Sequence, residues 1–176
     1  MKLFIASLII FLILLTIVLA DNNLTASSFE SLSFKDKVIM TPDVAFLWNF
    51  QRGVEEIYRF AKFTSAMRIE YSLELSERRI GEMEVLVDKN ESGVVPMVEN
   101  EYEREIDKIQ VDMNSTDIFS TIIQSPADIK ENVTQRLQYD INVLNEISKN
   151  SADEARTSLV SAINKTSSSI IFINNL

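Results

Sequence analysis

The sequence contains neither cysteine nor histidine. These two absences exclude disulfide bonds, thiol nucleophiles, imidazole general bases and the usual zinc and copper sites, so we expect no metal centre of those types and no cofactor. Without disulfides, the fold has to be stabilised by core packing, and 46% of the 176 residues are hydrophobic. That share is sufficient for one folded domain of ordinary size.

Glycine and proline are also scarce, with three of each. A sandwich or barrel of many short strands needs more turn-forming residues, so the composition favours an all-α fold. Basic residues number 17 against 26 acidic ones, which gives a net charge of -9. Because binding to a nucleic-acid backbone requires a basic surface, we expect no nucleic-acid partner.

Residues 1–20 carry one charge, at Lys2, and residues 3–20 form an uninterrupted uncharged, mainly apolar run. The boundary between Ala20 and Asp21 fits the small-residue cleavage site of a secretory signal peptide. As a helix, the apolar run would reach about 27 Å, close to the hydrocarbon thickness of a bilayer, so it also fits a retained membrane anchor. Both interpretations stay open, and both predict an exported domain in the cell envelope or outside the cell.

Five Asn-X-Ser/Thr triplets are candidate glycosylation sites, a modification of exported domains. Their acceptor residues are Asn23, Asn90, Asn114, Asn132 and Asn164. The short pattern also occurs by chance on polar surfaces, so ordinary surface triplets remain the alternative.

Residues 21–40 show no sustained period and are predicted to be an irregular tether. The first helix is predicted to begin at Thr41-Pro42, a cap followed by a proline suited to the first turn, and to run to about residue 61. Its predicted apolar face consists of Val44, Leu47, Trp48, Gln51, Val54, Ile57, Tyr58 and Ala61. On its predicted exposed face, Arg52 pairs with Glu56 and Glu55 pairs with Arg59.

Five further segments follow the same logic. A helix over 65–88 has a coiled-coil-like apolar seam, and its exposed face is predicted to carry Glu74, Arg78 and Glu82. Helices are also predicted from Val95-Pro96 to Met113, from Ser125-Pro126 onward, and from a capping box at Ser151 onward, with a short helix or apolar turn over 118–123. The buried positions expected in these segments are Ile69, Leu73, Ser76, Ile80, Met83, Val87, Val98, Tyr102, Ile106, Ile109, Met113, Ile129, Val133, Leu137, Ile141, Leu144, Ile147, Ala155, Leu159, Ala162 and Ile163, with residues 170–173 packing on the bundle.

The acidic run from Glu99 to Asp107 is predicted to be a solvated helix face, because residues two apart on a helix point in different directions and cannot converge on a cation. Arg78-Arg79 is surrounded by Glu74, Glu77 and Glu82, so we expect the two arginines to pair within the chain. Trp48 is interpreted as a core anchor. No phosphate-binding loop or nucleophile motif is present, and the chain is predicted not to be an enzyme.

Residues 41–110 resemble the domain of unknown function 5667 family of exported bacterial and archaeal helical domains. The matching motifs are Thr41-Pro42-Asp43, Phe46-Leu47-Trp48, Gln51-Arg52 with Glu55, Leu73 to Ile80 with Glu82, and Tyr102. The family usually has Ala in place of Ser76 and Leu in place of Ile80, both mild differences. The resemblance implies a helical fold and export, and it supplies no catalytic residues.

Together, these observations predict an antiparallel bundle of four to five helices over residues 41–176, after an N-terminal apolar export or anchor helix. The predicted function is that of a secreted or envelope-bound module, non-enzymatic, that binds an unidentified protein or has a structural role. The membrane is a further partner if residues 1–20 are retained. The alternative is an extracellular module that binds a cation or a small ligand.

Overall fold

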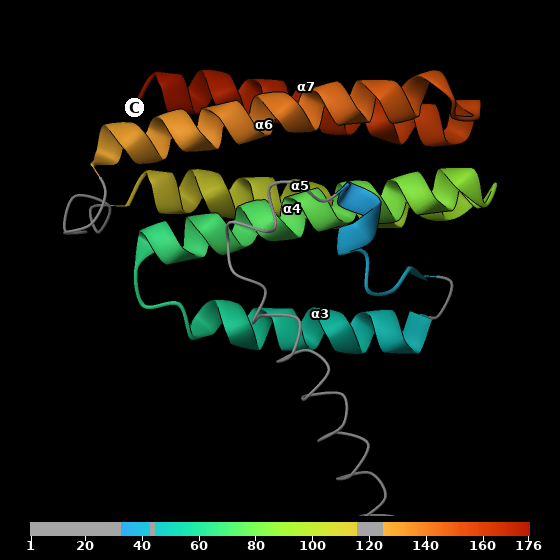
Figure 1. Cartoon of the computed structure of the whole chain (residues 1–176), viewed down its shortest axis with the longest axis horizontal. Helices are drawn as coiled ribbons and strands as arrows, with labels where there is room; N and C mark the ends of the chain where they lie inside the picture. The colour runs from blue at the N-terminus through green and yellow to red at the C-terminus, as the bar shows by residue number, and fades with distance from the viewer. Residues whose placement is uncertain (1–32, 43–44, 116–124) are drawn as a thin grey trace, which may run out of the picture. The chain divides into compact units, whose positions relative to one another are not determined.

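The computed structural model describes residues 33–42, 45–115 and 125–176. Over these residues the fold is all-α, with five helices and no strand, as predicted (Figure 1). The helices are α3 (Ala45–Phe60), α4 (Ser65–Asp88), α5 (Val95–Met113), α6 (Pro126–Lys149) and α7 (Asp153–Asn174), with 3-10 turns η1 (Phe34–Lys37) and η3 (Ser92–Val94).

Several sequence predictions lie outside the described residues. These are the apolar helix of residues 1–20, the Ala20–Asp21 cleavage point, Asn23 and the short helix over 118–123. None of the helices in the described part of the chain is both long and apolar enough to cross a membrane.

Local capping explains where the helices begin. At α4, the Thr64 hydroxyl accepts from the backbone N–H of Met67 at 3.2 Å, and at α6 Ser125 and Asp128 form a capping box. The predicted capping box at Ser151 is wrong. The N-cap of α7 is Ala152, and the Ser151 hydroxyl instead donates to the Ile147 carbonyl at 2.6 Å, at the end of α6.

Helices α4 to α7 enclose the main core. Helix α4 packs on α5 and α6, while α7 packs on α5 and α6, and short turns make α4–α5 and α6–α7 antiparallel pairs (Figure 1). Most core positions predicted in α4 to α7 are buried, while Val87, Ile141 and Ile163 are half-buried. Of residues 170–173, Ile173 is buried but Ile171 and Phe172 are exposed, so the prediction that this segment packs on the bundle is only partly confirmed. The buried apolar side chains that join the four helices include Leu73, Ile80, Met83, Tyr102, Ile106, Leu137, Leu144 and Leu159.

Within the segment predicted to be a tether, η1 lies directly on α4. A Cβ on Gly81 of α4 would stand 2.1 Å from the Phe34 carbonyl oxygen, so only glycine permits this approach. The Phe34 ring meets Tyr139 of α6 edge to face at 5.4 Å, and Lys35 pairs with Asp88 at 2.6 Å. The compact unit therefore begins at Phe34.

Candidate functional site

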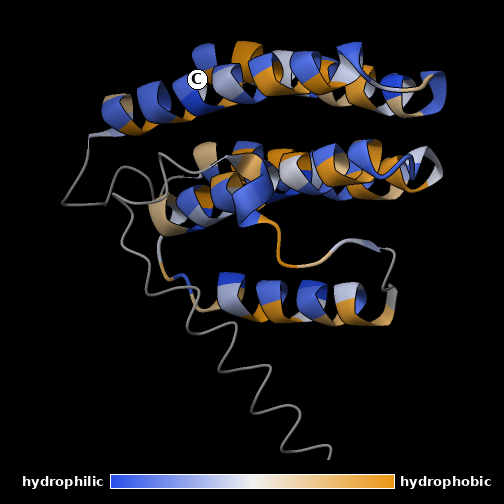
Figure 2. Ribbon diagram, turned by 45° about the vertical axis from the view of Figure 1, so that its right-hand side comes forward, coloured by the Kyte–Doolittle hydropathy of each residue, from blue (hydrophilic) through white to orange (hydrophobic). Residues whose placement is uncertain are grey.

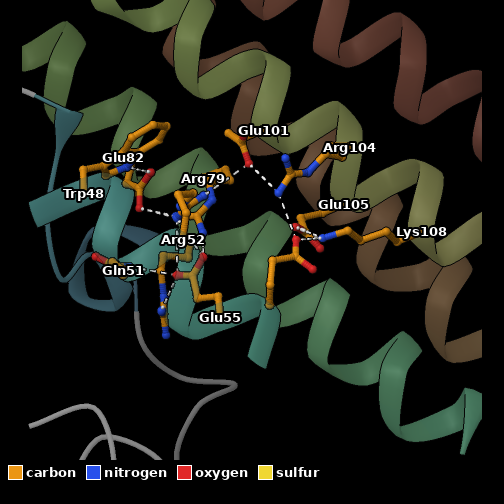
Figure 3. Close-up of polar contacts among 12 residues, drawn as sticks. Trp48, Gln51, Arg52, Glu55, Arg79, Glu82, Glu101, Arg104, Glu105 and Lys108 are labelled. Carbon is orange, nitrogen blue, oxygen red and sulfur yellow. Dashed lines mark hydrogen bonds and ion pairs between the residues drawn. The ribbon is translucent and has the colours of Figure 1, made fainter. Parts of the chain in front are cut away.

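Helix α3 turns a mainly polar face toward α4 and α5. Trp48, Gln51, Arg52 and Glu55 are buried on this face, and Figure 3 shows their side chains directed at α4. This arrangement corrects the sequence prediction, which placed Arg52 and Glu55 on an exposed face. A surface helix normally turns its charged side outward, so α3 is inverted relative to the usual pattern.

Helix α4 supplies the matching charges. Arg79 and Glu82 are fully buried, although Glu82 was predicted to be exposed. Arg79 donates to Glu55 and to Glu82, and Arg52 lies 3.0 Å from Glu55 and 3.6 Å from Glu82. The Trp48 ring N–H donates to Glu82 at 3.1 Å (Figure 3). With Arg78, which lies 3.1 Å from Glu55, two carboxylates and three guanidinium groups thus form one network between α3 and α4.

Burial dominates the protonation of this network. It raises the pKa of Glu82 to about 7, against the opposing effects of Arg52 and the Trp48 hydrogen bond. Burial likewise raises the pKa of Glu55, although Arg52 and Arg78 favour its charged form. The cationic partners therefore offset only part of the cost of taking these carboxylates out of water.

A second, more exposed group of ion pairs connects α3 to α5. Glu56 lies 2.6 Å from Lys108 and 2.9 Å from Arg104, while Lys108 also pairs with Glu105 at 2.9 Å (Figure 3). Glu105 is buried, as is Glu99, so the prediction of a uniformly solvated acidic face is wrong. The five acidic positions from Glu99 to Asp107 differ in burial because residues two apart occupy different sides of α5.

At the other end of α3 lies an open pocket of about 360 Å³. Its lining residues are Glu56, Arg59, Phe60, Lys62 and Arg68. Two of these cations already have an internal partner, because Arg59 pairs with Asp112 and Arg68 lies 2.8 Å from the same carboxylate. The pocket is thus basic, with much of its charge already balanced.

The opposite face of α3 is apolar and turned away from the bundle (Figure 2). Phe46 is 80% exposed, Ile57 is 71% exposed and Phe60 is 91% exposed. With half-buried Phe50 and exposed Gly53, these residues form what we call the outer stripe. Ile57 was predicted to be buried, and this prediction is wrong. Trp48 is buried as predicted, but within the charged network.

A second buried polar cluster joins α4, α5, α6 and α7. Asp140 is fully buried, accepts a long hydrogen bond of 3.4 Å from Ser76, and leaves its other oxygen without a partner. Burial and then the charge of Glu77 raise its pKa well above the ordinary value. Nearby, the Tyr102 and Thr166 hydroxyls are 2.6 Å apart.

The remaining predicted site residues are dispersed. Asn90, Asn114, Asn132 and Asn164 are all exposed, at a helix-ending turn, a helix C-terminus and two helix surfaces. Glycosylation at these positions stays a prediction. No group of three acidic residues positioned to hold a metal ion occurs in the described ranges.

Sequence reasoning anticipated that Arg78 and Arg79 pair within the chain, and this is confirmed, with Glu82 among the partners. It missed Glu55, the partner supplied by α3. The available signal was the repeat of Phe46, Phe50, Ile57 and Phe60 at spacings of four, seven and three, which defines a second apolar face that competes with the one around Trp48.

Comparison with known proteins gives one match. A family model described as a domain of unknown function (DUF5667) matches residues 39–160, a region that includes α3 to α6 and the first part of α7. It contains residues 41–110, whose motifs resemble the same family. No curated protein and no solved structure matches the chain.

Proposed function

Because the chain belongs to the domain of unknown function 5667 family, whose description names no activity, we propose its function from its own surfaces. The protein is an exported, non-enzymatic helical module of the cell envelope or the extracellular space. It acts through protein contacts made by the outer stripe of α3.

The observation that carries this proposal is the inversion of α3. Three large apolar side chains, Phe46, Ile57 and Phe60, are mostly in water on one helix face, while Arg52 and Glu55 of the same helix are buried. A contiguous apolar surface of this kind is characteristic of an interaction site. The buried charges of α3, on Arg52 and Glu55, pair with Glu82 and Arg79 of α4, which suits a structural role in holding the stripe outward.

The contact is tested by placing a photo-cross-linking amino acid at Ile57 in the native host. We expect covalent protein adducts from this position. The matched control is Asn142, an exposed residue of α6, where we expect none. Equal yields at the two positions, or no adduct at Ile57, would overturn the proposal.

Export is tested separately by sequencing the N-terminus of protein isolated from the native host. Asp21 as the first residue supports secretion after cleavage. Met1 or Lys2 in the membrane fraction supports an anchored, exported domain. An uncleaved chain recovered from the cytosolic fraction would contradict export in either form.

The rival function, an extracellular module for a cation or small ligand, is favoured by one observation, the open pocket at the end of α3. Its lining by Arg59, Lys62 and Arg68 suits an anion better than a cation. Calorimetry with calcium and magnesium addresses the cation form. Binding tighter than about millimolar, the weak limit of extracellular calcium modules, would favour the rival.

A further inference from the structure

Gly53 lies in the middle of the outer stripe and has no steric role within its own fold. A Cβ added there meets no atom within 4 Å, and no glycine of the described chain uses a positive φ. Glycine destabilises a helix interior relative to alanine, so its presence here lacks an internal explanation. Gly81 differs from Gly53 in this respect, because a Cβ at Gly81 would clash with the Phe34 carbonyl oxygen. A glycine on an exposed helix face does, however, allow another backbone to approach closely.

The stripe is nearly symmetric about this glycine. Phe46 precedes Gly53 by seven residues and Phe60 follows it by seven, while Phe50 and Ile57 lie three before and four after. These spacings of four and three form a heptad seam, the pattern by which one helix packs on another. If two such helices cross antiparallel at Gly53, each Phe46 meets the Phe60 of the other helix. A face that complements itself under a two-fold rotation is what an isologous dimer requires.

We infer that the occupant of the outer stripe is a second copy of this chain, with the two α3 helices packed antiparallel across Gly53. This inference rests on the proposed function, since it names the protein that the stripe contacts.

The exposed apolar area is adequate for such a contact. Beyond the end of α3, Phe63 is 88% exposed and Met67 is 53% exposed, and both continue the apolar surface in sequence. At about 200 Å² for each large side chain, these two with Phe46, Ile57 and Phe60 expose about 750 Å². A stable protein interface buries about 800 Å² of each partner, so the apolar area exposed between residues 46 and 67 approaches what a dimer requires.

Charge does not oppose the contact, although each copy has a net charge of -9. The exposed ionisable side chain on α3 beside the stripe is Glu56, and it is neutralised by Lys108 at 2.6 Å and Arg104 at 2.9 Å. A membrane surface fits less well, because interfacial helices usually carry Lys and Arg along their polar face, whereas the cations of α3 are turned inward to Glu55 and Asp112.

Sedimentation of the protein purified from its host, in the form that N-terminal sequencing identifies, measures the association. We expect a monomer–dimer equilibrium at protein concentrations up to about 100 µM, the range of weak specific association. Gly53→Leu should weaken dimerisation about tenfold or more, because its side chain enters the crossing. The same variant should keep or increase the thermal stability of the monomer, because nothing lies within 4 Å of the added Cβ. Asn142→Leu on α6 is the matched control and should leave association unchanged.

Cross-linking tests the antiparallel order, and the natural chain has no cysteine to interfere. A mixture of Phe46→Cys and Phe60→Cys proteins should form mixed disulfide dimers under mild oxidation, while each variant alone should form few. Efficient self-linking of Phe46→Cys would indicate a parallel pair and overturn the antiparallel assignment.

Other outcomes are equally distinct. A purely monomeric protein over the same concentrations overturns the inference. If Ile57 cross-links to a different protein in the host, the proposed function survives and the self-association fails. If the chain instead sediments with zwitterionic lipid vesicles and Gly53→Leu does not change that binding, the stripe contacts a membrane, and the dimer is wrong.

Discussion

Replacing Arg79 by methionine tests whether charge pairing holds α3 on the bundle. Arg79 is fully buried and links Glu55 of α3 to Glu82 of α4. Removing one partner of a buried ion pair costs about 3–5 kcal/mol, because an unpaired charge remains inside. Arg52 stays 3.0 Å from Glu55 and 3.6 Å from Glu82, so we expect a loss near the lower limit, about 3 kcal/mol.

Urea denaturation with two signals is the assay. Trp48 is the only tryptophan of the chain and lies in the network on α3, so its fluorescence reports on this helix, while far-UV circular dichroism follows all helices. In Arg79→Met, we expect the fluorescence transition to move to lower urea than the loss of helix signal, because α4 to α7 keep their apolar core.

Arg104→Met is the matched control. Arg104 also pairs with two carboxylates, those of Glu56 and Glu101, but about half of its side chain is in water. Pairs of this kind contribute about 0–1 kcal/mol. If Arg79→Met loses less than about 0.5 kcal/mol and leaves the Trp48 emission unchanged, the reasoning is refuted, and apolar contacts of α3 are sufficient to hold it.

Three further predictions concern the bundle. Leu73→Ala should destabilise the protein by about 2–5 kcal/mol, since Leu73 is fully buried, whereas Ile171→Ala on the α7 surface should cost under about 0.5 kcal/mol; similar values by urea denaturation would contradict the described core. Asp140→Asn should be more stable than the natural protein at pH 8 and about equally stable near pH 4. The reason is that folding raises the pKa of Asp140, so the stability that this carboxyl contributes at acid pH is lost as the pH rises through the folded-state pKa. Lower stability of the variant than of the natural protein at pH 8 would refute this. Gly81→Ala should cost about 1–3 kcal/mol, since its methyl group meets the Phe34 carbonyl, and a thermal midpoint equal to that of the natural protein would contradict the close approach.

The bundle itself was predictable from residue spacing. The helix over 65–88 has the predicted bounds because its two ends are determined locally, by the Thr64 cap and by a turn in which Asn90 adopts a positive φ. Leu73 and Ile80 are buried because they belong to a row of apolar residues spaced three and four apart, which places their side chains on the same face of the helix. In such cases, the sequence within one helix contains enough information to orient it.

The orientation of α3 could not be predicted in this way. Its sequence has apolar residues on two sides, one around Trp48 and one along the outer stripe, and periodicity within the helix does not decide which is buried. The choice depends on Arg79 and Glu82, more than 20 residues away, which complement Arg52 and Glu55. Matching of charges between helices is a property of the pair, so no analysis of either helix alone reveals it.

The attachment of α3 at both ends has a kinetic consequence. Before α3, the turn η1 packs on α4 at Gly81. After α3, Ser65 begins α4, and its hydroxyl oxygen lies 2.5 Å from the hydroxyl oxygen of Ser115. If α3 separates from the bundle, it therefore remains a closed loop of about 30 residues, whose closure entropy grows only slowly with length. The loop keeps α3 at an effective concentration of about millimolar beside its own binding surface. A molecule that binds the inner face of α3 must therefore compete with the surface of α4 and α5, to which α3 stays connected. The return of α3 to this surface is a first-order process, so its rate does not depend on the protein concentration.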